Sequence, residues 1–139
     1  MEPAQLARTL SSARSGGVAR VAWCDRPFSV RHAHDREGRP LLLCRVGGAL
    51  DRALSPGDVA VVINFAGQLW ISGWTCALTG GEERAAALDF VEVNPVSDLL
   101  DVGRGFRLYG VDLAEIRLKT GSRLVDVDVI DYASSEPVT

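Results

Sequence analysis

The alternation of polar and apolar positions is clearest in residues 28–45 (Phe-Ser-Val-Arg-His-Ala-His-Asp-Arg-Glu-Gly-Arg-Pro-Leu-Leu-Leu-Cys-Arg). Every second side chain from Phe28 to His34 shares one face of a strand, because side chains alternate with period two. Residues 35–38 supply a turn, and residues 41–43 form a short apolar run typical of a strand that is buried on both faces. The pattern therefore predicts a β-hairpin.

Strand-like patterns recur along the rest of the chain. They occupy residues 18–24, 59–65, 68–78, 106–111, 113–119 and 124–130. The run Val-Ala-Val-Val-Ile-Asn-Phe at 59–65 is the most β-prone of these and predicts a central strand. In residues 68–78, Trp70 and Trp74 fall on the same face. With the hairpin, these patterns predict about seven strands.

Helical spacing is confined to a few segments. It predicts a short helix at residues 3–14, where Pro3 suits the first turn, and a longer one at residues 82–93. Acidic residues open the second helix, where they favour the positive end of the helix dipole. Residues 49–54 and 96–102 are expected to form helical turns at most.

The order of these segments favours a barrel. The strands are not separated by regular crossover helices, which argues against a doubly wound parallel sheet. A closed or partly closed antiparallel barrel is economical because it removes exposed sheet edges. We therefore expect one domain over residues 1–139, mainly β with flanking helices. It is expected to begin with a helical segment at 1–17 and to end in a frayed polar tail at 132–139.

Composition and charge exclude several classes of protein. The net charge of −3 and the pI near 5.3 leave no basic stripe for a phosphate backbone, so no nucleic-acid partner is expected. The N-terminus lacks a signal-peptide pattern and no apolar run reaches the roughly 18 residues of a membrane span, so no membrane partner is expected. Cys24, Cys44 and Cys76 lack C-x-x-C spacing and fall in apolar contexts, which favours reduced thiols in a cytoplasmic protein.

Several short motifs carry a resemblance to a known family. The hairpin with Gly38-Arg39-Pro40, the central strand, the Trp-containing strand, the helix opened by Glu82-Glu83 and the segment Phe106-Arg107-Leu108-Tyr109 follow one another in this order. This order resembles the FMN-binding split-barrel superfamily, which includes the pyridoxamine 5′-phosphate oxidases. Residues 101–119 and the pair Asp131-Tyr132 are similar to its haem-utilisation branch. The resemblance covers roughly residues 18 to 135.

The resemblance implies a split β-barrel of about six to seven mostly antiparallel strands. It also implies a homodimer whose cofactor cleft, for FMN or haem, lies between the subunits. Two departures accompany it. Thr120-Gly121-Ser122-Arg123 stands where haem-utilisation relatives carry Gly-Gly-Phe-Gly, and the barrel strands are poor in the Arg, Lys, Ser and Thr that surround an FMN phosphate.

His32 and His34 are the candidate cofactor ligands. At i and i+2 on one strand their imidazoles face the same way, which suits one axial haem ligand or a substrate contact. The alternative is a solvated strand end beside a charged turn. A zinc site would need further ligands, and only Asp35 lies nearby, so no metal site is predicted.

Arginine and tryptophan side chains complete the candidate site. Arg31, Arg45 and Arg52 could hold a phosphate or a propionate through the guanidinium fork, although ordinary surface charge is an equal alternative. Trp70 and Trp74 could stack on a flat cofactor. The alternative is that this pair fills a barrel core or a subunit interface.

Two hypotheses about function follow. In the first, the protein binds haem or FMN at a dimer cleft, with His32 or His34 on the cofactor and Arg45 or Arg52 on its acidic groups. In the second, the same barrel has no cofactor and serves as a dimeric binding or regulatory module. The sequence shows no catalytic motif, and an enzyme of this kind would be a flavin- or haem-dependent oxidoreductase.

Overall fold

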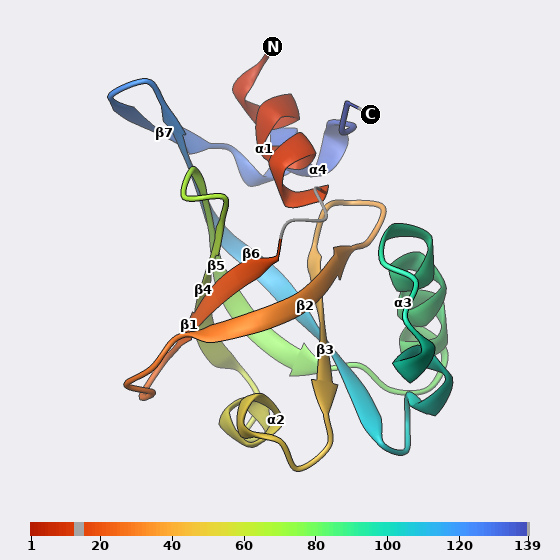
Figure 1. Ribbon diagram of the computed structural model, residues 1–139. Coiled ribbons are helices and arrows are strands. Elements are labelled where there is room, and N and C mark those ends of the chain that lie inside the picture. Colours follow the sequence, from red (N-terminus) through yellow and green to blue (C-terminus); the bar gives the residue numbers. More distant parts are fainter. Residues whose placement is uncertain (13–15, 139) are drawn as a thin grey trace.

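The seven strands form one antiparallel sheet that closes on itself. A computed structural model of the chain describes residues 1–12 and 16–138. The strands are β1 (Gly17–Val21), β2 (Phe28–His34), β3 (Pro40–Arg45), β4 (Val59–Phe65), β5 (Leu69–Ala77), β6 (Phe106–Thr120) and β7 (Arg123–Val127). Their order is β3-β2-β1-β4-β5-β6-β7, and β3 also pairs with β6 (Figure 1). This extra pairing closes six strands into a barrel, with β7 added outside. The predicted fold class, mainly β with flanking helices, is confirmed.

A single long strand, β6, closes the barrel. Its first part pairs with β3, from Arg45 opposite Phe106 to Leu41 opposite Gly110, and its second part pairs with β7. The prediction of two separate strands at 106–111 and 113–119 was wrong, because one strand spans both. The pairing register between β5 and β6 shifts between Ser72 and Gly73. The alternation of buried and exposed side chains along β6 changes phase at this point, and in the sequence this looks like the end of one strand and the start of another.

Gly73 permits this irregularity. A Cβ atom at that position would lie 2.0 Å from the main-chain oxygen of Asp112, which no side chain could accommodate without moving the backbone. Glycine inside a strand often marks such a close approach of two backbones. The bend of β6 across the barrel therefore depends on a residue with no side chain.

The helices cover the two ends and one side of the barrel. They are α1 (Pro3–Ser12), α2 (Ala49–Leu54), α3 (Gly80–Val93), the 3₁₀ helix η1 (Ser97–Asp101) and α4 (Val129–Ser134). In Figure 1, α2 lies across the lower end, α1 and α4 lie together at the upper end, and α3 packs beside β2. Figure 1 draws residues 13–15 in grey, so the expected end of the first helix at Arg14 lies outside the described residues. None of the helices in the described part of the chain is long and apolar enough to cross a membrane.

The apolar side chains form two clusters that share β3. Leu42 and Cys44 belong to the cluster inside the barrel, whereas Leu41 and Leu43 belong to a second cluster that includes Phe90 of α3. Successive side chains of β3 point to opposite faces, and both faces are covered. The prediction that this run is buried on both faces is confirmed.

The C-terminal segment differs from the expected frayed tail. The strand β7 ends at Val127, and Asp128 caps α4 by accepting hydrogen bonds from the main-chain N–H groups of Ile130 and Asp131. Tyr132 is fully buried, and its hydroxyl donates to the main-chain oxygen of Gly38 at 2.6 Å. This buried aromatic side chain anchors a segment that is otherwise mostly exposed.

Arg8 of α1 completes this anchor. It is 3% exposed, and its guanidinium donates to the main-chain oxygens of Tyr132, Ala133, Ser135 and Arg36. A buried charge is tolerated when it is hydrogen-bonded, and here carbonyls of α4, of the residue after it and of the β2–β3 turn accept from Nη1 and Nη2, whereas Nε has no partner among the described residues. The first and last helices are thereby joined to each other and to the hairpin.

We expect Gly38→Ala to destabilise the fold more than Gly57→Ala. Both glycines have positive φ, +79° and +81°, so each alanine costs about 1–2 kcal/mol through its backbone conformation. At Gly38 a Cβ atom would also lie 2.5 Å from Arg8 Cδ and 2.7 Å from Tyr132, whereas at Gly57 it meets nothing within 4 Å. We expect this crowding to add roughly 1–3 kcal/mol in the free energy of unfolding, measured by urea denaturation. Equal losses in both variants would contradict the packing at Arg8.

Candidate functional site

His32 lies inside the barrel rather than at a solvated strand end. It is 5% exposed, and its ring centroid lies 4.7 Å from that of Phe65 in an edge-on arrangement. Burial lowers the pKa of His32, because a charged imidazole is poorly solvated there. The ring is therefore mainly neutral at pH 7 and packs as an aromatic side chain.

His34 is the more accessible of the two histidines. It is half-buried at the end of β2, and its Nδ1 atom is enclosed without a hydrogen-bond partner among the described residues. Burial and the nearby charge of Arg8 lower the pKa of His34, against the opposing effect of Asp35 and Asp89. Its neutral ring keeps a free lone pair, which is the form that can bind a metal or accept a hydrogen bond.

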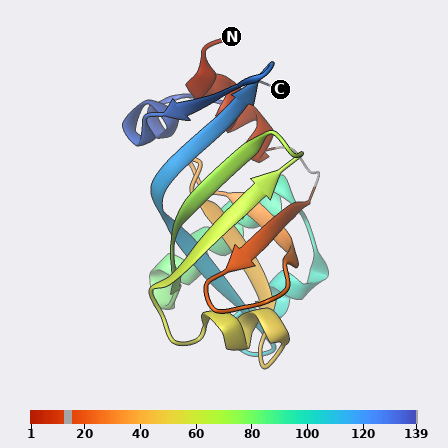
Figure 2. The ribbon, with the colours of Figure 1, turned by 90° about the vertical axis from the view of Figure 1, so that its left-hand side faces the viewer.

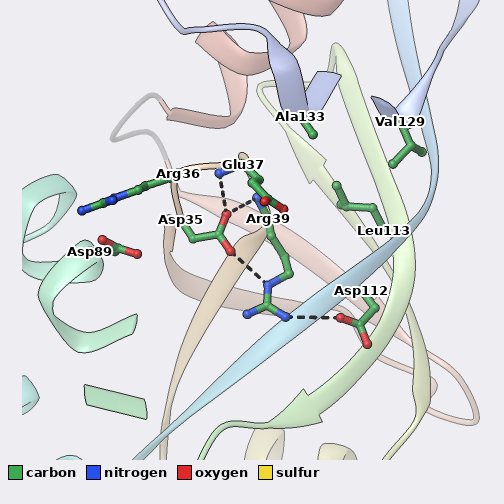
Figure 3. Close-up of a pocket in the computed structure, with 9 residues that line it drawn as sticks. All are labelled: Asp35, Arg36, Glu37, Arg39, Asp89, Asp112, Leu113, Val129 and Ala133. Carbon is green, nitrogen blue, oxygen red and sulfur yellow. Dashed lines mark hydrogen bonds and ion pairs between the residues drawn. The ribbon is translucent and has the colours of Figure 1, made fainter. Parts of the chain in front are cut away.

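A charged pocket of about 510 Å³ lies beside His34, between the β2–β3 turn, α3, α4 and β6. Its lining residues are Asp35, Arg36, Glu37, Arg39, Asp89, Asp112, Leu113, Val129 and Ala133. Figure 3 shows the guanidinium of Arg39 between two carboxylates, with Nε donating to Asp35 at 3.1 Å and Nη1 to Asp112 at 3.2 Å. Arg39, Asp35 and Asp112 thus satisfy one another, and the pocket offers a polar surface made largely of charged side chains.

Sequence reasoning did not find this pocket. Arg39 and Asp112 are 73 positions apart, and neither belongs to a sequence motif that predicts an ion pair with a distant residue. Asp35 also accepts hydrogen bonds from the main-chain N–H groups of Glu37 and Arg39, so its local role as a turn residue was visible but its ion pair was not. The three residues meet because β6 passes beneath the β2–β3 turn.

Arg45 and Arg52 lie at the other end of the barrel. Both are exposed, Arg45 at the last position of β3 and Arg52 on α2. His34 pairs with Pro40, five positions before Arg45 on β3, which places the two ends of the hairpin roughly 17 Å apart along the strand. The structure therefore does not bring the two predicted arginines together with the two predicted histidines. Arg31, the third arginine considered, pairs instead with Asp98 at 2.6 Å.

The helix that carries Arg52 is held by a buried carboxylate. Asp51 accepts hydrogen bonds from the hydroxyl of Tyr109 at 2.6 Å and from the main-chain N–H of Gly47 at 2.9 Å, with Arg107 at 3.6 Å. Burial and this hydrogen bond raise the pKa of Tyr109 to about 12. The network holds α2 across the end of the barrel and thereby determines where on the surface the guanidinium of Arg52 lies.

Trp70 and Trp74 lie on the outer face of β5, with Leu69 and Ile71 on the opposite, inner face. Trp74 is 50% exposed and Trp70 is half-buried, so the pair does not fill the barrel core. Two shallow grooves of about 430 and 390 Å³ run along this face, one beside each tryptophan. Figure 2 views this side of the molecule, where β1, β4, β5 and β6 lie next to one another.

The six predicted site residues thus fall in three regions. The histidines lie near the α1 end, the arginines at the α2 end, and the tryptophans on the outer sheet face. Within residues 1–12 and 16–138, no three His, Cys, Asp or Glu side chains are arranged to hold a metal ion. The cofactor-binding role of the six residues stays a prediction.

We expect stability to fall on acidification because both histidines have lowered pKa values in the folded state. Between the folded pKa and the ordinary value of 6.5, the unfolded chain binds more protons, so the free energy of unfolding decreases as the pH falls. The slope is at most about 1.4 kcal/mol per pH unit for each histidine. Urea denaturation between about pH 7 and about pH 5 should give a smaller slope for His32→Leu than for the unmodified chain. The same slope in both proteins would show that His32 titrates normally.

Comparisons with known proteins identify the fold. No protein-family model and no curated protein matches the chain. Among solved structures, a haem-binding protein from Mycobacterium smegmatis matches 99% of this chain at 17% identity with a TM-score of 0.77. The chain spans 62% of that protein's length.

Two further solved structures are matched over nearly their own full length. A Listeria innocua protein assigned by name to the pyridoxamine 5′-phosphate oxidases matches 84% of this chain and 98% of its own, at 14% identity and a TM-score of 0.60. An FAD-binding protein from Mycobacterium smegmatis matches 84% of this chain and 93% of its own, at 13% identity and a TM-score of 0.58. The resemblance predicted from the motifs is confirmed for the fold. The chain has the split-barrel fold of the pyridoxamine 5′-phosphate oxidase-like proteins.

Proposed function

We propose that this protein is a cytoplasmic split-barrel protein that binds haem or FMN at a cleft completed by a second copy of the chain. The observation that carries the proposal is the likeness over 99% of the chain to a protein described as haem-binding, together with the shared fold of an FAD-binding protein. The three cysteines are free, which accords with a reducing compartment.

The two exposed arginines fit the anionic groups of either cofactor. The guanidinium groups of Arg45 and Arg52 are not buried in the fold, and each can form a fork of two hydrogen bonds with a propionate or a phosphate. A bound flavin would supply the redox chemistry, while the protein would supply its position and electrostatic surroundings. The role of the arginines would be to orient the cofactor by its charged end.

The histidines fit a cofactor less well. His32 would have to leave its contact with Phe65 to reach a ligand outside the barrel. The pKa of His34 is lowered by burial, but its unpartnered Nδ1 is enclosed, and the residue lies at the opposite end of the hairpin from the arginines. A cofactor held by Arg45 and Arg52 would therefore be bound without a histidine of the same subunit.

The burial of His32 favours a second candidate function, a dimeric binding or regulatory module without a cofactor. If both histidines serve the fold, they are not available as cofactor ligands, and the exposed arginines could bind the acidic groups of a partner instead. The two candidates share the dimer and differ in whether a cofactor binds, so one titration separates them.

We expect purified protein to bind haem or FMN with saturation near one cofactor per subunit. Absorption spectra recorded during titration with each cofactor should show a shift that saturates, in the Soret band for haem or in the flavin bands for FMN. The double variant Arg45→Ala, Arg52→Ala should weaken binding by about tenfold or more, since a charged hydrogen bond contributes roughly 1.5–3 kcal/mol.

Arg123→Ala on β7 is the matched control, because Arg123 is also an exposed arginine but lies on the added strand. It should leave the affinity unchanged. Spectra that do not change with either cofactor would overturn the first candidate and leave the module without a cofactor.

A further inference from the structure

The first and last helices of the chain form one unit over the upper end of the barrel. In Figure 1, α1 and α4 lie together above the strands, beside both chain ends. Ala7 of α1 and Tyr132 of α4 are fully buried and belong to the apolar cluster inside the barrel. We refer to α1 and α4 together as the terminal pair.

Polar contacts join the two helices to each other. Nη1 of Arg8 donates to the main-chain oxygens of Tyr132 and Ala133 at 3.1 and 3.2 Å. The hydroxyls of Ser11 and Tyr132 lie 2.8 Å apart, within hydrogen-bond distance. Farther along, the main-chain N–H of Val138 donates to Thr9 Oγ1 at 3.0 Å. Each contact joins residues more than about 120 positions apart, so the two ends of the chain support each other.

Neither helix is long enough to persist without this support. The helix α1 has 10 residues and α4 has 6. Isolated helices shorter than about 12–15 residues are marginal in water, because the first turn is costly to form. Departure of α1 removes the contacts of Arg8 and Ser11 from α4, and departure of α4 removes the buried Tyr132 from α1. The two helices are therefore expected to leave the barrel together.

The junction of the terminal pair with the hairpin is also where hydrogen bonding is incomplete. In the part of the chain that the structure describes, the buried side-chain nitrogen and oxygen atoms without a hydrogen-bond partner are Arg8 Nε and His34 Nδ1. Nη2 of Arg8 donates to the oxygen of Arg36, in the turn that follows the strand of His34. A buried polar atom without a partner costs free energy, and water would satisfy both atoms if the junction opened.

The terminal pair covers a histidine of β2. The helix α1 packs against β2, and His32 is hydrogen-bonded to the main chain of Ser11. His32 is 5% exposed, and Phe65 of β4 packs against its ring. The strands that enclose His32 are held by inter-strand pairing, whereas α1 is held by the contacts with α4 and the hairpin. Removal of the terminal pair would thus uncover His32 without separating any strands.

We propose that α1 and α4 open together as one lid while the barrel stays folded, and that opening exposes the imidazole of His32 to solutes. Water that reaches Arg8 Nε and His34 Nδ1 offsets part of the contacts that are lost. The open form presents an imidazole at the upper end of the barrel, and the closed form withholds it. This inference rests on neither the cofactor nor the homodimer of the proposed function.

Native-state hydrogen exchange of the full chain, resolved by fragment with mass spectrometry, tests the joint opening. We expect the amides of α1 and α4 to share one opening equilibrium and to exchange faster than those of β4 and β5. Tyr132→Phe keeps the ring but removes the hydroxyl that contacts Ser11 and Gly38. It should accelerate exchange in both helices by the same factor, about tenfold or more.

Tyr109→Phe is the matched control, because it removes the hydroxyl of another buried tyrosine, at the α2 end of the barrel. Its contact with Asp51 is kept when the lid opens, so exchange in α1 and α4 should be unchanged while the strands exchange faster. Ser11→Ala tests the coupling in the other direction. A change confined to α1 should accelerate exchange in α4.

Chemical modification tests the exposure of His32. The chain has 2 histidines, so carbethoxylation by diethyl pyrocarbonate can be assigned to each by mass spectrometry. Tyr132→Phe should increase the rate of modification at His32 by the factor measured for exchange in α1. Tyr109→Phe should leave that rate unchanged.

Three results would overturn the proposal. Acceleration by Tyr132→Phe that is confined to α4 would show that the helices open separately. Amides of α1 and α4 that exchange no faster than those of β4 and β5 would show that the pair leaves only when the whole chain unfolds. A rate of modification at His32 that does not follow exchange in α1 would show that the lid does not cover the imidazole. The cofactor titration with the arginine variants is a separate measurement that none of these results decides.

Discussion

The structure depends on the pairing of β6 with three other strands. Its hydrogen bonds with β3 close the barrel, and those with β5 and β7 extend along the rest of its 15 residues. The close approach of Gly73 to the backbone of Asp112 lets the strand bend without breaking. The same strand supplies Tyr109 to the network that seats α2 and Asp112 to the charged pocket. Both ends of the barrel are thus organised by one strand.

A buried guanidinium unites the two chain ends with this barrel. Arg8 is surrounded by main-chain oxygens and has no carboxylate among its hydrogen-bond partners in the described chain. Together with burial, its positive charge lowers the pKa of His34. The packing of α1 against the hairpin is therefore linked to the protonation of the His34 imidazole. Adding a proton to His34 would place a second positive charge beside the first. Burial, the larger cause, and this repulsion together lower the pKa of His34, so acidification weakens the region where α1 meets the hairpin.

The interior of the barrel is filled by side chains, which confines binding to its outside. His32 belongs to that interior, whereas the exposed arginines at the α2 end and the apolar face of β5 remain available to ligands and partners. A fold of this kind carries different functions through groups attached to one scaffold. The proposed cofactor cleft needs both copies of the chain, whereas their association can be measured without a cofactor.

The sequence by itself determined the strands, the long helix and the doubly buried run at β3, because these depend on local alternation and propensity. Its short motifs also indicated the split barrel. It could not predict that β6 is continuous, since a bulge shifts the alternation in the same way as a break. Nor could it place Tyr132, whose burial depends on Arg8 and Gly38 at the other end of the chain.

The candidate site shows the same division. The sequence placed His32 and His34 on one strand face and Trp70 and Trp74 on another, but it could not tell which face would be inside. Closure of the sheet decided that the first imidazole is enclosed and that the indoles face outward. The pairing of Arg39 with Asp112 was likewise settled only in three dimensions. Contacts between distant segments depend on which strands pair, and the pattern of a single sequence constrains the register within a hairpin but not the pairing of distant strands.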